Sequence, residues 1–173
     1  MIDWTKLFDF TDYDKLLPLV TNSLIAGALL ALVGGLVGVF VMTRQLSFAV
    51  HGISELSFAG AAIFLLIGLD VVLGSLVGSL TATAIIAFLG EKAKDRNSIV
   101  AVLMPFGLGV GILALSLYPG RAANKFGLLT GQIVAVDDPQ LLSMAIMVGI
   151  SLLSLLLIWR PLTFASLDSE VAA

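Results

Sequence analysis

Four long runs of uncharged, mostly apolar residues constrain this chain more than any other feature. They cover residues 19–42, 71–90, 99–118 and 140–159, and are 24, 20, 20 and 20 residues long. An α-helix rises about 1.5 Å per residue, so about 20 apolar residues cross the roughly 30 Å hydrocarbon core of a bilayer. The runs therefore predict four membrane-spanning helices.

A fifth spanning helix has to begin among polar residues. The uncharged stretch 56–69 is only 14 residues long, which gives about 21 Å of helix and falls short of the bilayer core. Only Asp70 separates this stretch from the next run, so no long loop fits there. A spanning helix must therefore start near Ser47, and it carries His51 and Glu55 at or inside the membrane boundary.

Composition agrees with an integral membrane protein. Of the 173 residues, 59% are hydrophobic and 12% are charged, whereas a soluble domain carries about 25% charged residues. Cysteine is absent and the net charge is −3, which argues against a secreted disulfide scaffold and against a nucleic-acid partner. We expect an all-α, polytopic bundle in the cell membrane, with about five transmembrane helices at about 19–42, 48–69, 71–90, 98–118 and 140–159.

The remaining segments fall at the membrane surfaces. Residues 1–18 are predicted to form an extracytoplasmic segment, and residues 19–160 the transmembrane domain. The apolar segment 126–136 is too short to cross and is predicted to be interfacial or re-entrant. Asp138, followed by proline, is the expected N-terminal cap of the last helix.

The distribution of lysine and arginine predicts the orientation. The connections after the first, third and fifth helices hold five cations, and the other side holds four. They are Arg44, Lys92, Lys94, Arg96 and Arg160 against Lys6, Lys15, Arg121 and Lys125. Three of the five lie in the short connection 91–97, so we place that connection in the cytosol and the N-terminus outside.

Three helices contain two glycines four residues apart, a spacing that allows membrane helices to pack closely. The pairs are Gly34 and Gly38, Gly74 and Gly78, and Gly107 and Gly111. Glycine-rich helices also produce such spacings by chance, so we interpret them as support for a compact bundle and not for a specific dimer face. Pro105, inside the fourth helix, predicts a kink. We favour the interpretation that this kink shapes the bundle over the alternative of a transport hinge.

His51 and Glu55 are the candidate metal ligands. Their i, i+4 spacing puts both side chains on one helix face. An imidazole and a carboxylate together suit zinc, manganese or ferrous iron. The alternative is a His–Glu hydrogen bond that staples the helix near the interface, and the spacing alone leaves both possibilities open.

Two ligands from one chain are fewer than the three or four of a zinc site. A twofold dimer with this helix beside the axis would bring two copies of His51 and Glu55 together. The sequence has no phosphate-binding Gly-x-x-x-x-Gly-Lys-Ser/Thr motif and no His-Glu-x-x-His motif, so neither ATP hydrolysis nor zinc-protease activity is expected of this chain.

Residues 40–48 (FVMTRQLSF) and 51–55 (HGISE) resemble the membrane permeases of zinc and manganese ABC importers. In that family a basic residue and a Ser-Phe pair precede Asp-Ala-Leu-Ser-His and a small Pro-Gly step. Matching places are held here by Arg44, Ser47, Phe48, Ser54 and Gly60. The family's metal-contacting Asp and His fall on His51 and Glu55, so the resemblance implies a site with the order reversed. Ala59 stands where proline is common.

Two later stretches extend the resemblance. Residues 128–135 (LLTGQIVA) resemble the segment before the family's fifth helix, and residues 160–170 resemble the approach to a cytosolic coupling helix that docks on the ATPase. Residues 161–173 are therefore expected to start that coupling segment. Family members are longer, so the chain is expected to be a fragment or a truncated product.

The resemblance implies a permease subunit that is not an enzyme and has no cofactor, and that imports a divalent transition metal ion such as zinc, manganese or iron. The implied partners are membrane lipid, a second copy or a similar permease, a cytosolic ATPase subunit and an extracytoplasmic metal-binding protein. The alternatives are a transporter subunit for an organic solute and a non-transporting helical membrane module.

The orientation is tested by a single-cysteine variant, because the chain has no cysteine of its own. In Lys94→Cys, the new thiol should resist a membrane-impermeant reagent added from outside and should react once the membrane is opened. Efficient labelling in intact cells would invert the topology.

Overall fold

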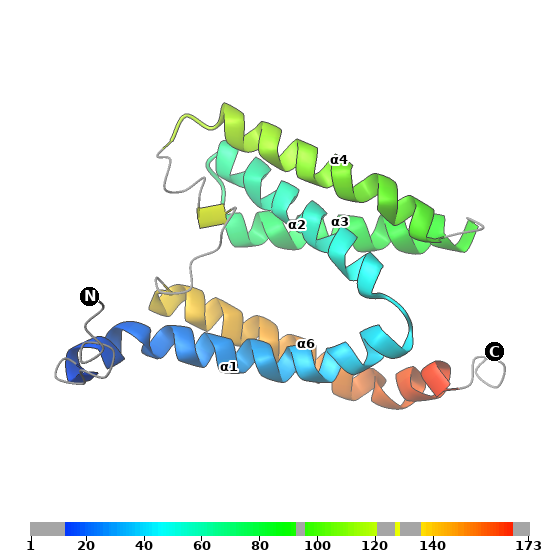
Figure 1. The fold of residues 1–173 in the computed structure, drawn as a ribbon, viewed down its shortest axis with the longest axis horizontal. Helices are drawn as coiled ribbons and strands as arrows, with labels where there is room; N and C mark the ends of the chain where they lie inside the picture. The colour runs from blue at the N-terminus through cyan, green and yellow to red at the C-terminus, as the bar shows by residue number, and fades with distance from the viewer. Residues whose placement is uncertain (1–12, 93–95, 121–126, 129–135, 168–173) are drawn as a thin grey trace, which may run out of the picture. The chain divides into compact units, whose positions relative to one another are not determined.

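The computed structural model describes residues 13–92, 96–120, 127–128 and 136–167, and this part of the chain forms five α-helices (Figure 1). The helices are α1 (Tyr13–Thr43), α2 (Ser47–Leu66), α3 (Val71–Lys92), α4 (Arg96–Leu117) and α6 (Asp138–Leu167). Of the predicted segment 126–136, only residues 127, 128 and 136 lie within the described part.

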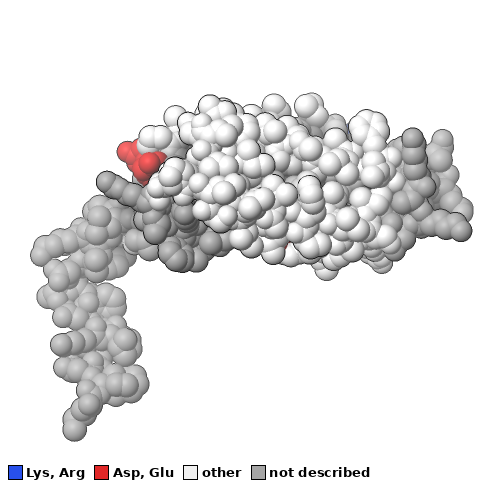
Figure 2. Space-filling view, turned by 90° about the horizontal axis from the view of Figure 1, so that it is seen from above, with Lys and Arg blue, Asp and Glu red and all other residues white. Residues whose placement is uncertain are grey.

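All five helices are long and apolar enough to cross a membrane, so the prediction of an all-α bundle with five spans is confirmed. The candidate spans are Val20–Thr43, Ser47–Leu66, Val71–Leu89, Asn97–Leu117 and Asp138–Phe164. Their outward faces carry many exposed leucine, isoleucine, valine and phenylalanine side chains. The described residues seen in Figure 2 are almost all uncharged, apart from an acidic group at one edge. Such a surface suits contact with lipid.

The chain divides into two compact units. In the unit formed by Val41–Gly131, α2 packs against both α3 and α4, while α3 and α4 contact each other less. One apolar cluster joins all three helices through Ala49, Ile86 and Val100. A second cluster joins α2 to α4 through Ala62, Ala114 and Leu115. Helix α2 is therefore the centre of this unit, and its neighbours determine what its side chains can reach.

Glycines allow α2 and α3 to touch backbone to backbone. A methyl group added at Gly74 would lie 2.6 Å from the carbonyl oxygen of Gly60. One added at Gly78 would overlap the carbonyl oxygen of Leu56. The Ser57 hydroxyl also donates a hydrogen bond of 3.0 Å to the Ser75 carbonyl across the same contact. Gly74 and Gly78 are thus part of the interface between α2 and α3 within one chain.

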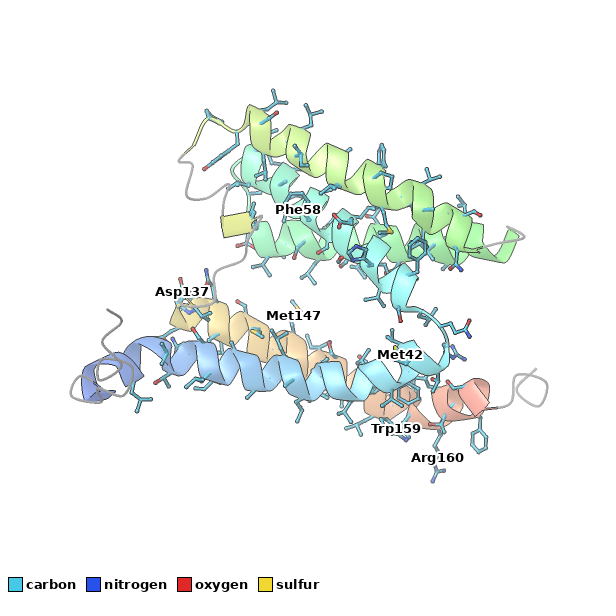
Figure 3. The ribbon with its side chains drawn as sticks, viewed as in Figure 1. Met42, Phe58, Asp137, Met147, Trp159 and Arg160 are labelled. Carbon is cyan, nitrogen blue, oxygen red and sulfur yellow. The ribbon has the colours of Figure 1, made fainter. Side chains whose placement is uncertain are left out.

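The other unit contains α1 up to Phe40 and α6. Near the start of both helices, the Asn22 amide donates to the Val136 carbonyl at 3.2 Å and to Asp138 Oδ1 at 2.8 Å. Near their other ends, the rings of Phe40 and Trp159 meet edge to face with centroids 5.2 Å apart. Trp159 is labelled in Figure 3. The two helices therefore run parallel within this unit.

Two helices end in the same motif, in which a left-handed residue lets backbone amides bond to the last turn. After α1, Leu46 N–H donates to Val41 and Gln45 takes the left-handed conformation with φ 52°. After α2, Leu69 N–H donates to the Phe64 carbonyl, and Gly68 adopts the left-handed conformation with φ 77°. These bonds satisfy carbonyl groups that would otherwise need water.

The first turns of α3 and α6 are capped by carboxylates. Asp70 Oδ1 accepts a 2.8 Å hydrogen bond from Leu73 N–H at the start of α3. At the start of α6, Asp137 Oδ1 accepts one from Gln140 N–H at 2.8 Å. The prediction that Asp138 caps this helix is therefore wrong, because Asp138 is already helical and its carboxylate accepts from Asn22.

Helix α6 also extends beyond the predicted end at residue 159 and continues to Leu167 with Pro161 inside it. A proline removes one backbone hydrogen bond, and hydroxyl side chains can support the helix around it in a membrane. Here the Thr163 hydroxyl donates 2.8 Å to the Trp159 carbonyl within the turn that contains the proline.

The packing predicts the effect of Gly78→Ala. The added methyl group would press on the Leu56 carbonyl and force α3 away from α2, an overpacking that typically costs about 1–3 kcal/mol. Thermal unfolding of the purified protein in detergent should show a lower midpoint. The matched control is Gly38→Ala, where no atom lies within 4 Å of the added methyl group, and its midpoint should not fall. Equal midpoints for the two variants would contradict this packing.

Candidate metal site on α2

Helix α2 begins at Ser47, so His51 and Glu55 lie inside a helix that is long enough to span. At about 1.5 Å per residue, His51 lies about 6 Å and Glu55 about 12 Å along the axis from the first residue. If α2 spans the bilayer with Ser47 at the boundary of the hydrocarbon core, Glu55 lies within a core of roughly 30 Å. The sequence prediction that length forces both residues into the span agrees with this helix.

The two side chains lie on one face of α2. His51 Nε2 is 3.8 Å from Glu55 Oε1, within ion-pair range but too long for a direct hydrogen bond. The His51 side chain is 60% exposed, whereas that of Glu55 is 21% exposed. The imidazole is thus accessible, and the carboxylate is set back against neighbouring residues.

Ser54 adds a third polar side chain next to this pair. Its hydroxyl donates a 2.7 Å hydrogen bond to the His51 carbonyl, one turn earlier. The hydroxyl hydrogen is thereby engaged in this bond to the backbone carbonyl, and the hydroxyl oxygen can still accept a hydrogen bond or bind a cation. Ser54 can therefore present an acceptor beside the carboxylate.

Glu55 lines a hollow of about 280 Å³ between α2, α4 and the segment at residue 128. The lining residues are Ser54, Glu55, Phe58, Leu108 and Leu128. This volume accommodates several water molecules or a partly hydrated ion. Among the described residues of the lining, the one ionisable group is a carboxylate, so this part of the hollow favours a cation.

Beyond the hollow, the same face of α2 becomes apolar. Phe58 and Leu128 belong both to the lining and to the residues that pack on the buried cluster of Ala62, Ala114 and Leu115. Figure 3 shows Phe58 projecting from α2. The polar part of the face therefore ends at Phe58.

Within the described residues, no three His, Cys, Asp or Glu side chains come together. His51 and Glu55 are thus two candidate ligands from one chain, with Ser54 beside them. Ser54, three residues after His51, and Phe58, three residues after Glu55, follow from helical spacing. Leu108 and Leu128 come from other parts of the chain, and no sequence pattern relates them to the site.

The family of this chain follows from its similarity to known proteins. Residues 17–173 match the ABC 3 transport family. The chain belongs to this family. The resemblance to metal ABC importer permeases is therefore confirmed.

Several curated relatives carry manganese in their names. The manganese import system permease protein ScaB of Streptococcus parasanguinis is 27% identical over 166 residues, which cover 95% of this chain and 59% of that protein. The manganese transport system membrane protein MntC of Halalkalibacterium halodurans is 24% identical over 166 residues, covering 92% and 56%. The chain thus spans a little more than half the length of these relatives.

A solved structure shows the same fold. PsaBC from Streptococcus pneumoniae in complex with Fab is similar with a TM-score of 0.75 and 25% sequence identity. The similarity covers 89% of this chain and 56% of the chain in that structure. The helix arrangement is therefore that of a multi-pass permease in a cell membrane.

Proposed function

We propose that this chain forms part of the membrane path of an ABC importer for a divalent transition metal ion. The observation that carries the proposal is the His51–Glu55 pair on one face of a spanning helix, with Glu55 lining a hollow. An ionised side chain inside the bilayer costs about 2.5–3.5 kcal/mol even on the most lenient scale. Such residues in membrane proteins usually mark an ion or substrate path.

Manganese is the ion we propose. Carboxylate oxygen and water are ligands that suit manganese, and imidazole suits the later metals of the series, zinc included. The less exposed member of the pair is the carboxylate, and the hollow beside it has room for water. The manganese systems named among the relatives support the same choice.

A second permease copy, or a similar permease, would complete the site. Two side chains of one chain leave most of the coordination sphere of a divalent ion open. The 60% exposure of His51 leaves its imidazole free to meet groups supplied from elsewhere. Loose coordination by two ligands per copy, completed by water, would also allow the ion to leave.

The other proposed partners follow from the family. ATP hydrolysis would take place on a separate cytosolic subunit, and an extracytoplasmic metal-binding protein would deliver the ion. Residues 161–173 would start the segment that contacts the ATPase. Phe164, at the far end of α6, is 69% exposed, which leaves its ring available to such a partner.

Substitution of either ligand tests the proposal. In His51→Ala and Glu55→Gln, manganese uptake per permease molecule should fall at least about tenfold, since losing even a residue that supports a metal ligand costs about 10–100-fold. Uptake is measured with radioactive manganese in cells expressing the full permease, and is divided by the amount of permease in the membrane. The decrease in manganese uptake caused by excess zinc or iron then shows how well each ion competes for the same path.

The control for this experiment is Asp70→Asn. It makes the same carboxylate-to-amide change at the α3 cap, where asparagine serves equally well, so uptake should persist. If the pair only staples the helix, the two ligand variants will have less permease in the membrane but unchanged uptake per molecule. That outcome would overturn the proposed path.

The coupling segment is tested through association. In Phe164→Ala, less of the partner ATPase should copurify with the permease, because the variant removes an exposed ring from the proposed contact. Leu157→Ala on the same helix, where the side chain is 76% exposed, should leave copurification unchanged. Equal recovery of the ATPase after removal of residues 161–173 would reject this contact.

A further inference from the structure

Helix α4 meets the candidate site through two glycines one turn apart, Gly107 and Gly111. Both are buried, while Gly109 between them is exposed. A methyl group added at Gly109 would meet no atom within 4 Å. The three glycines therefore differ in what they contact, although they share one short stretch of helix.

Gly107 lies against the backbone of α2 at the level of Glu55. A methyl group added there would be 3.1 Å from the carbonyl carbon of Glu55, 3.1 Å from the amide nitrogen of Leu56 and 2.8 Å from Leu56 Cδ1. Two of these atoms are backbone, which cannot rotate aside. The absence of a side chain at Gly107 thus sets how closely α4 approaches the peptide that carries Glu55.

Gly111 accommodates the ring of Phe58. A methyl group added there would overlap the ring, with Cδ1 at 2.6 Å and Cζ at 3.2 Å. The ring is held on one side by this glycine and on another by the cluster around Ala62. Because Phe58 also lines the hollow, a displaced ring can move into it.

We propose that Gly107 and Gly111 are positioning residues that keep the hollow beside Glu55 open to a divalent cation. Gly107 sets the distance between α4 and the peptide bond that joins Glu55 to Leu56. Gly111 holds the Phe58 ring out of the space into which the carboxylate points. The ion in this inference rests on the proposed function, but the open hollow is tested without transport.

The test uses Ser54→Cys as a reporter, because Ser54 lines the hollow and the chain has no other thiol. The rate of modification by a small cationic methanethiosulfonate is measured on the full permease in membranes. Adding Gly111→Ala should slow the reaction by about tenfold, since the ring is forced toward the thiol. Adding Gly109→Ala should leave the rate unchanged.

Rescue separates positioning from general damage to the fold. Phe58→Leu removes the ring, so in the Gly111→Ala background it should restore the modification rate. The same Phe58→Leu should not restore the rate in the Gly107→Ala background, where the contact is between backbones. An unfolded permease would show fast labelling in both variants and no specific rescue.

The outcomes distinguish this inference from the proposed function. A modification rate that is the same in Gly111→Ala and Gly109→Ala overturns the inference, whatever the uptake. A slowed and rescued rate, together with no manganese uptake by the permease that retains Ser54, Phe58 and Gly111, upholds the inference and overturns the proposed ion. Manganese uptake that falls and recovers in parallel with the labelling rate supports both.

Discussion

Direct contact between helix backbones is the interaction on which this structure depends. In lipid, apolar side chains gain little by leaving the bilayer for one another, so helices associate through close packing and a few hydrogen bonds. Helix α2 achieves this on two sides, at Gly74 and Gly78 of α3 and at Gly107 of α4. Any larger residue at these positions would separate the helices. The place of every polar group on α2 follows from these contacts.

The same packing explains how a carboxylate can lie within a membrane helix. Glu55 is partly covered by α4, yet it opens onto a hollow with room for water and has an imidazole 3.8 Å away. An isolated carboxylate facing lipid would lose its hydration without gaining a hydrogen bond or an ion pair. The apolar cluster beyond Phe58 confines the polar part of the face to the first turns of the helix. Structure and chemistry therefore agree on a limited cation-favouring space.

The sequence predicts these features unevenly. The start of α2 follows from bilayer thickness, and the shared face of His51 and Glu55 follows from helical geometry. The cap of α6 is misassigned to Asp138, because neighbouring aspartates are equivalent until the Asn22 contact decides their roles. The partner of each glycine is also beyond the sequence, since spacing says nothing about which helix approaches. Leu108 enters the site only through such an approach.

The short connection between α2 and α3 has a consequence for how the protein is made. Its backbone groups are bonded within the turn, and Asp70 is the one charged residue between positions 56 and 90. In the predicted orientation, this hairpin would carry a single carboxylate across the bilayer during biosynthesis. Its glycine contacts join residues close in sequence, and such local contacts form early. The hairpin can thus enter the membrane as a preassembled pair, against which α4 packs as it follows from the ribosome.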